Sequence, residues 1–173
     1  MSPKALLVID MLNDFIDEKG TLYCGQESKN IIAFIQDRLS TFREHGDLVI
    51  FMQDSHDEND TEFERYPPHA VEGTWGNEII PELNPAFKDA VIPKKTLSSF
   101  YGTRLKETLE QGGVKEVEVV GVCTSICIMD AVGELVNRGY KVSVPVKGVA
   151  DFDPLSHDFA LKRMQQVYGA NIE

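Results

Sequence analysis

The sequence of 173 residues has little of what several classes of protein require. It has three cysteines, an odd number and too few for a disulfide scaffold. No apolar run approaches the roughly 20 residues that a membrane-spanning helix needs. The first residues, Met1–Lys4, lead straight into a short apolar segment and show no pattern of a secretory signal. We therefore expect a cytoplasmic protein with free thiols and no membrane partner.

Positive charge is also scarce. The chain has 17 Lys and Arg against 28 Asp and Glu, which gives a formal net charge of −11. Such a chain lacks the basic surface that binds nucleic acid phosphates or anionic lipids, so we expect neither as a partner. Its hydrophobic fraction of 42% is typical of a globular protein, and its length suits one hydrophobic core. We expect residues 1–173 to form a single domain that acts on a small molecule.

Short apolar runs alternate with segments of helical periodicity. Ala5–Ile9 and Leu48–Met52 are typical of buried strands, because every residue in them is apolar. Strands that alternate with helices predict a parallel sheet. We expect an α/β fold of three layers (α/β/α), Rossmann-like, with a mostly parallel six-stranded sheet and helices on both faces. The predicted strands are 5–9, 48–52, 90–92, 117–120, 140–145 and 170–172, and the predicted helices are 28–45, 103–111, 124–137 and 154–168.

Residues able to do chemistry follow the ends of four predicted strands. Parallel strands bring their carboxyl ends to one edge of the sheet, where ligands bind in such folds. Side chains unrelated in function would not be expected to gather there. An acid, a pair of metal-ligand type, a base and two thiols occupy these positions: Asp10, Asp54 with His56, Lys94, and Cys123 with Cys127. The sequence therefore predicts a catalytic site at this edge of the sheet.

The cysteine at position 127 lies at a junction between a strand and a helix. A thiol there feels the positive end of the helix dipole, which favours the thiolate and makes Cys127 a candidate nucleophile. The alternative is a buried structural cysteine, a common role for free thiols. Cys24 has no partner motif, and we interpret it as a packing residue. We interpret His157, near the start of the last helix, as exposed or structural.

Asp10 and Lys94 are the candidates to act with this thiol. A carboxylate directly after an apolar strand needs a partner or a function. It could cap the helical segment that follows, but Asn13 and Asp14 are better placed for capping, which leaves Asp10 free to act as a base. A lysine held near a thiol and a carboxylate would stabilise the thiolate. The alternative for Lys94 is a solvated position on a loop, beside Lys95.

The long polar loop after the second predicted strand contains two of the four histidines. Loops of this length in compact domains are usually functional or disordered. Asp54 and His56 alternate in an extended segment, so their side chains point to one side, and His69 follows further along the loop. This donor set suits Zn²⁺, Fe²⁺ or Mn²⁺, with Glu62 or Glu64 as a further ligand. The alternative is a polar, solvated loop without a metal.

Five segments of the sequence match one known family. They are Leu6–Phe15 (LLVIDMLNDF), Asp54–His56 (DSH), Tyr66–His69 (YPPH), Lys94–Phe100 (KKTLSSF) and Gly121–Cys127 (GVCTSIC). Each segment is modest alone, but all five occur in the family's order over nearly the whole chain. The sequence therefore resembles the isochorismatase-like cysteine hydrolases. Within that family the metal-type motif favours the nicotinamidase (pyrazinamidase) branch.

The resemblance implies hydrolysis of nicotinamide to nicotinate and ammonia, a step of NAD salvage and pyridine nucleotide biosynthesis. It implies a catalytic triad of Asp10, Lys94 and Cys127. The carboxylate would take the thiol proton, the ammonium would stabilise the anionic pair, and the thiolate would attack the carboxamide to form a thioester. The backbone N–H groups of Cys123 and Cys127 would form the oxyanion hole, with a cis peptide bond between Val122 and Cys123.

The resemblance also implies a divalent metal ion, in the first place Zn²⁺. Asp54, His56 and His69 would hold it, with Glu62 as the extra ligand. The ion would bind the pyridine nitrogen and orient the ring, as a template and not as the source of the nucleophile. Fe²⁺ and Mn²⁺ are the alternatives to zinc.

Phe15 and Tyr66 would form walls of the ring pocket, and the family's assemblies imply a homo-oligomer. Tyr66 stands where relatives often have Trp, Ser125 where they often have an acidic residue, and Leu12 where they often have Gln. Two other interpretations stay open. One is a hydrolase of the same family that acts on another small amide or related substrate, and the other is a non-catalytic binding module on the same fold.

Overall fold

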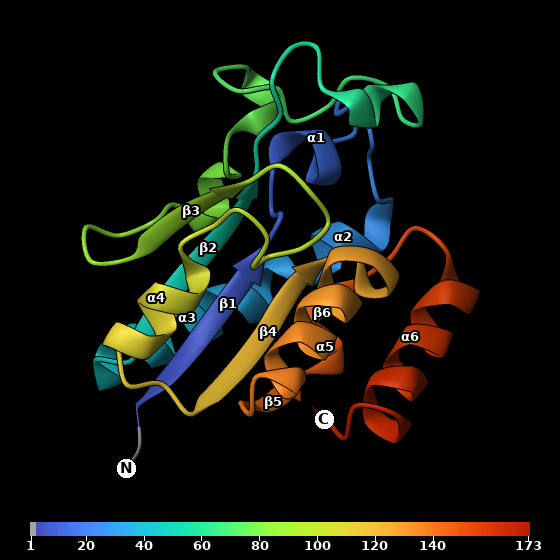
Figure 1. The fold of residues 1–173 in the computed structure, drawn as a ribbon. Coiled ribbons are helices and arrows are strands. Elements are labelled where there is room, and N and C mark those ends of the chain that lie inside the picture. The colour runs from blue at the N-terminus through green and yellow to red at the C-terminus, as the bar shows by residue number, and fades with distance from the viewer. Residues whose placement is uncertain (1–2) are drawn as a thin grey trace.

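The structure, a computed structural model, describes residues 3–173. Its centre is a parallel sheet with the strand order β3-β2-β1-β4-β5-β7, and β6 pairs with the carboxyl end of β4 (Figure 1). Among the helices of residues 3–173, none combines the length and the apolar character of a membrane-spanning segment. The strands are β1 (Lys4–Ile9), β2 (Leu48–Asp54), β3 (Ala90–Lys94), β4 (Glu116–Val122), β5 (Lys141–Val144), β6 (Val149–Ala150) and β7 (Asn171–Ile172).

Helices cover both faces of the sheet. Successive residues of β1 face opposite sides, so that Leu6 and Val8 pack toward α3 while Leu7 and Ile9 pack toward α4, α5 and α6. Because neither face of the central strands meets water there, β1 is apolar from Ala5 to Ile9 and β4 is apolar from Val119 to Val122. The helices are α1 (Asn13–Ile16), α2 (Gln26–Asn30), α3 (Ile32–His45), α4 (Leu105–Gln111), α5 (Met129–Asn137) and α6 (Pro154–Gln166).

The predicted α/β fold, with a parallel sheet between two layers of helices, is confirmed. Three details differ from the sequence prediction. The predicted helix over 28–45 is divided at Ile31 into α2 and α3, and the predicted helix over 124–137 begins as a π-helical turn, Thr124–Ile128, before α5. The structure also adds β6, whose two residues are too few to give a periodic pattern.

The strand order places a topological switch between β1 and β4. From β1 the chain continues to β2 and β3 on one side, and it then returns to β4 and β5 on the other. In open α/β sheets ligands bind outside the carboxyl ends of the strands at such a switch. Asp10 directly follows β1 and Cys123 directly follows β4, so both residues lie at this point.

Gly121 allows β1 and β4 to approach closely at the switch. Its φ is +121°, a conformation that L-residues rarely adopt, and a Cβ built on it would overlap the carbonyl oxygen of Ile9. We expect Gly121→Ala to lower the free energy of unfolding by about 3 kcal/mol, because it adds backbone strain and a clash with backbone atoms that cannot move aside. Denaturant unfolding followed by circular dichroism would measure this loss.

Gly139 provides the matched control. Its φ is +85°, but nothing lies within 4 Å of a Cβ added there. Gly139→Ala should therefore cost about 1 kcal/mol, which is the effect of the backbone conformation alone. Equal losses in the two variants would contradict a role for the close approach of Gly121 to Ile9.

Candidate active site

Four strand ends bring the candidate catalytic residues into contact. Lys94, the last residue of β3, lies at the centre of the group. Its Nζ lies 2.9 Å from Oδ2 of Asp10 and 3.6 Å from Sγ of Cys127. It lies 3.0 Å from Oδ1 of Asp54, at the end of β2. We call Asp10, Lys94, Cys127 and Asp54 the lysine cluster.

The position of Lys94 follows from the pleat of β3. Successive side chains of a strand face opposite sides, so Pro93 is exposed while only 1% of the Lys94 surface is exposed. An ammonium group at this depth requires anionic partners, which Asp10 and Asp54 supply. The solvated-loop alternative for Lys94 is therefore wrong, although it describes the exposed Lys95.

Asp10 directly follows β1 in the left-handed region, with φ of +54°. The backbone N–H of Asp54 donates to its Oδ1 at 3.0 Å, and Nζ of Lys94 lies 2.9 Å from its Oδ2. It does not cap α1, whose N-cap residue is Leu12. Non-glycine residues in left-handed conformations cluster at functional sites. Asp10 is therefore held beside Lys94 by its neighbours and does not cap the start of α1.

Burial dominates the acid–base properties of the lysine cluster. It raises the pKa of Asp10 to about 6, although the Lys94 ammonium acts in the opposite direction. Burial also raises the pKa of the Cys127 thiol well above its ordinary value, and the charge of Lys94 does not cancel this effect. Burial alone would lower the pKa of Lys94, but the negative charge of Asp10 and its neighbours raises it well above the ordinary value.

Burial thus shifts the pKa of this thiol in the direction opposite to the shift that a helix N-terminus alone would cause. A buried anion loses more hydration than the dipole of one helix end returns. The raised pKa favours a neutral thiol before a substrate binds, and its Sγ lies 3.6 Å from Nζ of Lys94. Cys127 can thus lose its proton to Asp10 at the moment when its sulfur attacks a substrate.

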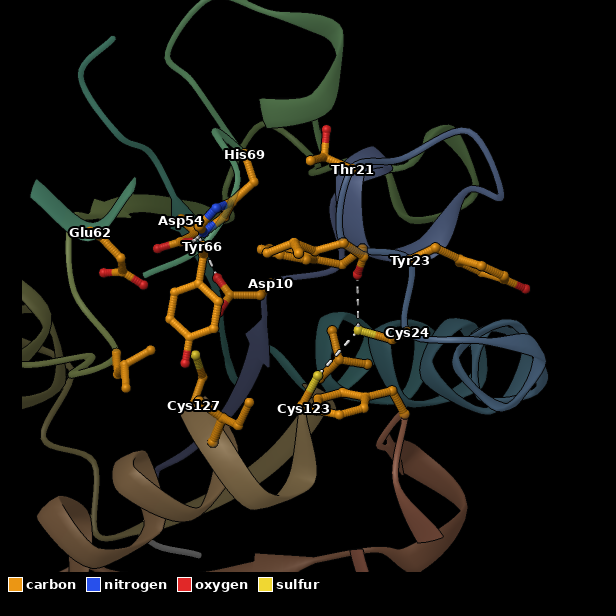
Figure 2. A pocket seen from close by; sticks show the side chains of 16 residues that line it. Asp10, Thr21, Tyr23, Cys24, Asp54, Glu62, Tyr66, His69, Cys123 and Cys127 are labelled. Atoms are coloured by element: carbon orange, nitrogen blue, oxygen red, sulfur yellow. Dashed lines mark hydrogen bonds and ion pairs between the residues drawn. The ribbon is translucent and has the colours of Figure 1, made fainter. Parts of the chain in front are cut away.

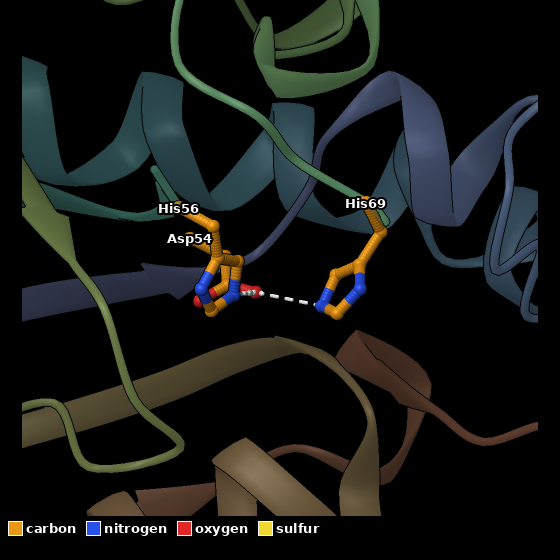
Figure 3. Close-up of side chains that lie close together, drawn as sticks. All are labelled: Asp54, His56 and His69. Carbon is orange, nitrogen blue, oxygen red and sulfur yellow. Dashed lines mark hydrogen bonds and ion pairs between the residues drawn. The ribbon is translucent and has the colours of Figure 1, made fainter. Parts of the chain in front are cut away.

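A second group of side chains lies beside the first. Oδ2 of Asp54 lies 3.0 Å from Nε2 of His56 and 3.5 Å from Nε2 of His69 (Figure 3). One ligand atom from each residue lies within 4.8 Å of the others, and all three residues are buried. We call Asp54, His56 and His69 the metal-donor cluster. Two imidazoles and a carboxylate around one point suit Zn²⁺, Fe²⁺ or Mn²⁺.

The outer nitrogen atoms of both histidines have partners that fix the ring orientation. Nδ1 of His69 donates to the carbonyl of Pro67 at 2.8 Å, and Nδ1 of His56 lies 3.0 Å from Oδ2 of Asp60. A histidine that donates from Nδ1 presents the lone pair of Nε2, an arrangement typical of metal ligands. The donor set therefore fits a divalent metal ion. Sequence reasoning did not identify Asp60, because it has the character of an ordinary loop acid.

The structure treats the two candidate extra ligands differently. Glu62 is 9% exposed and lines the cavity next to the metal-donor cluster, although it is not one of the three residues whose ligand atoms converge. Glu64 is exposed and does not line the cavity. Of these two acids, only Glu62 lines the cavity beside the metal-donor cluster.

A cavity of about 420 Å³ opens beside both clusters (Figure 2). Phe15 and Tyr66 line it, with ring centroids 5.8 Å and 6.3 Å from that of His69. Several other lining side chains are apolar, and they include Leu22, Leu97, Val122, Ile126 and Phe152. Asp10 and Cys127 also line the cavity. The space suits a small apolar ring that carries a polar group toward the thiol.

The other cysteines form part of the cavity wall. The peptide bond between Val122 and Cys123 is cis, as the resemblance implies. Sγ of Cys24 lies 3.1 Å from Sγ of Cys123, and Cys24 is buried as a packing residue would be (Figure 2). All three cysteines are free.

Two contacts hold the segment that carries the nucleophile. The carboxylate of Asp151 accepts a hydrogen bond from the backbone N–H of Ser125 at 2.7 Å. Nδ1 of His157 lies 2.9 Å from Oγ1 of Thr124, so the structural interpretation of His157 is confirmed. Sequence reasoning missed Asp151, because it lies 26 positions from Ser125 and no motif marks it.

The two clusters offer a nucleophile, a base, a cation and a set of metal donors around one cavity. A thiol beside a carboxylate can lose its proton as it attacks a carbonyl carbon, while the buried ammonium compensates for the negative charge. Such an arrangement is suited to acyl transfer from a small substrate.

Known proteins match this chain over nearly its whole length. The family model described as Isochorismatase domain matches residues 4–173. The crystal structure of nicotinamidase/pyrazinamidase PncA from Bacillus subtilis is similar, with 34% identity, a TM-score of 0.94 and coverage of 98% of both chains. N-carbamoylsarcosine amidase from Thermoplasma acidophilum has 32% identity, a TM-score of 0.89 and coverage of 99% of this chain and 95% of its own. Pyrazinamidase of Pyrococcus horikoshii in complex with zinc has 29% identity, a TM-score of 0.92 and coverage of 98% of both chains.

Proposed function

Because this chain belongs to the isochorismatase family, we propose that it is a nicotinamidase, which hydrolyses nicotinamide to nicotinate and ammonia. The family relatives described above are amidohydrolases, and amide hydrolysis is the activity of this chain. The observation that carries the choice of nicotinamide is that the Cys127 thiol and the metal-donor cluster border the same cavity. Nicotinamide has one polar group for each of them, a carboxamide and a pyridine nitrogen.

In this reaction the thiol is the nucleophile. Asp10 takes the proton of Cys127 as the sulfur attacks the carboxamide carbon, and Lys94 compensates for the negative charge. The oxyanion that forms accepts hydrogen bonds from the backbone N–H groups of Cys123 and Cys127. Asp10 then gives its proton to the leaving nitrogen, ammonia departs and a thioester remains. Water, deprotonated by Asp10, attacks the thioester, and nicotinate leaves as the thiol regains its proton.

The metal-donor cluster would hold a divalent ion, with Glu62 as a further ligand. We choose Zn²⁺ because the donors suit it and because the Pyrococcus horikoshii relative is in complex with zinc. When bound, the ion supplies a Lewis-acidic site for the pyridine nitrogen and so orients the ring. Phe15 and Tyr66 enclose the ring on its apolar sides.

A substrate comparison tests this proposal. Ammonia release would be measured for the zinc-loaded protein with nicotinamide, with benzamide, which lacks only the ring nitrogen, and with N-carbamoylsarcosine. We expect kcat/KM for nicotinamide to exceed that for benzamide by about 100-fold or more, because the metal contact is lost in benzamide. Preference for N-carbamoylsarcosine would place the chain in another branch of the family. No ammonia from any amide would support the non-catalytic binding module.

Removal of the metal should lower both activity and stability. We expect exhaustive chelation to reduce kcat/KM for nicotinamide by about 100-fold, since the ring loses its orienting contact, and to lower Tm. Added Zn²⁺ should restore both. Benzamide is the internal control, because its residual hydrolysis does not use the ring contact and should change little. Nicotinamide hydrolysis that survives complete chelation would contradict the template role.

A further inference from the structure

Asp14 is a buried carboxylate that the reaction described above does not use. It lies in α1, is 7% exposed, and forms no ion pair with any side chain of residues 3–173. The capping role that the sequence suggests for it is wrong. The N-cap residue of α1 is Leu12, and no side-chain hydrogen bond caps this helix. Its two oxygens instead accept backbone hydrogen bonds, Oδ2 from Ala70 at 2.7 Å and Oδ1 from Thr21 at 3.0 Å.

Ala70 links this carboxylate to both histidines of the metal-donor cluster. It directly follows His69, is fully buried, and has φ of +45°, which is rare for an alanine. Its carbonyl oxygen accepts the backbone N–H of His56 at 3.0 Å, while its own N–H donates to Asp14. Neighbouring groups must impose a left-handed conformation on a residue with a Cβ. Asp14 is the side chain that holds the N–H of this peptide.

The contact between Asp14 and Gly76 shows how closely the carboxylate is enclosed. A Cβ added to Gly76 would overlap the Asp14 carboxyl group. The backbone N–H of Thr21, the second donor to Asp14, belongs to a residue of the cavity wall. One carboxylate therefore joins the loop that carries His69 to the wall of the cavity.

We propose that Asp14 is a positioning residue for the metal-donor cluster. By holding the N–H of Ala70, it keeps the imidazole of His69 directed at Asp54, where Nε2 of His69 lies 3.5 Å from Oδ2. Through Thr21 it sets the position of the cavity wall relative to the same loop. This inference rests on the proposed function for the identity of the bound ion. The contacts of Asp14 with Ala70 and Thr21 come from the structure alone.

Asp14→Asn tests the inference with minimal change of shape. The carboxamide keeps one acceptor oxygen, but its NH₂ group cannot accept the second backbone N–H. We expect the Kd for Zn²⁺, measured by competition with a chromophoric chelator, to rise about 10- to 100-fold, as it does when other outer partners of metal ligands are removed. The visible spectrum of the Co²⁺-substituted protein should change as well. At saturating metal, KM for nicotinamide should rise more than kcat falls, because the lysine cluster is untouched.

Two further variants separate positioning from general loosening of the loop. Asn13 lies next to Asp14 and anchors the same loop through Nδ2, which donates to the carbonyl of Trp75 at 2.8 Å, away from Ala70. Asn13→Ala should lower Tm but leave the Kd for Zn²⁺ within about twofold of the parent value. Gly76→Ala, which displaces the carboxylate without removing it, should weaken Zn²⁺ binding as Asp14→Asn does.

The outcomes distinguish this inference from the proposed function. The inference would be overturned if folded Asp14→Asn bound Zn²⁺ with the same Kd as the parent. It would also be overturned if Asn13→Ala weakened Zn²⁺ binding as much as Asp14→Asn does. A parent protein that hydrolyses no nicotinamide, but whose Zn²⁺ affinity falls on Asp14→Asn, would refute the substrate and support the positioning role. If the parent binds no metal, crystal structures of the parent and of Asp14→Asn test the inference by the position of the His69 imidazole. Separation of His69 from Asp54 in the variant supports the inference, and an unchanged imidazole position overturns it.

Discussion

Cys127→Ala should abolish amide hydrolysis while the fold remains intact. The variant keeps the cavity, the base and the metal donors, but it lacks the atom that forms the thioester, so we expect kcat/KM to fall by about 10⁴-fold or more. The side chain is 8% exposed, and loss of one sulfur atom leaves only a small cavity, so Tm should change by a few degrees at most. Ammonia release and thermal unfolding would measure the two effects.

Cys24→Ala makes the same chemical change at another buried thiol. Cys24 lies beside Cys123 and not beside Asp10 or Lys94, so its loss should reduce kcat/KM by less than tenfold. Acid quench of the parent during turnover, followed by mass spectrometry, should detect a nicotinoyl group on Cys127 in the parent and none in Cys127→Ala. Ammonia release by Cys127→Ala at the parent rate would contradict the nucleophilic mechanism and would favour a family hydrolase that does not need the thiol.

The lysine cluster could be predicted from the sequence because the sheet is parallel. Asp10, Lys94 and Cys127 are far apart in the chain, but each lies at or after the carboxyl end of a strand, and these ends lie at the same edge. Recognising short apolar strands was therefore enough to group them. The same reasoning placed Asp54 and His56, and the second histidine of the polar loop that follows them added His69.

The supporting contacts could not be predicted in this way. Asp14 is 56 positions from Ala70, and Asp151 is 26 positions from Ser125. One member of each pair, Ala70 or Asp151, lies outside the helices and strands, where no periodicity of the sequence indicates which backbone N–H a carboxylate will meet. The effect of burial on the pKa of Cys127 could not be predicted for a related reason. The helix start is visible in the sequence, but the depth at which the sheet and its neighbours bury the thiol is a property of the tertiary structure.

Lys94→Met should cause the largest loss of stability among single substitutions in the site. Methionine has a similar length but no charge, so the buried carboxylates of Asp10 and Asp54 would lose the ammonium group that lies 2.9 Å and 3.0 Å from them. Removal of one partner from a buried ionic group costs about 3–5 kcal/mol, because the remaining charges stay desolvated and uncompensated. We expect a loss of this size in denaturant unfolding, together with loss of ammonia release.

Lys95→Met is the matched control, one residue along the chain. Its ammonium is exposed and pairs with Asp57 in solvent, where ion pairs contribute little, so this variant should unfold like the parent. A second comparison separates charge balance from packing. The double variant Asp10→Asn with Lys94→Met removes both charges, and Asp54 keeps its contacts with the histidines.

The double variant should therefore recover most of the stability lost in Lys94→Met, yet it should remain inactive. Stability requires only that buried charges are balanced, and a neutral pair satisfies this condition. Catalysis requires a base for the thiol proton and a cation for the anion that forms, and the double variant has neither. If the double variant is as unstable as Lys94→Met, the loss comes from packing and not from uncompensated charge. If the double variant regains activity, Asp10 and Lys94 are not the acid–base partners of Cys127.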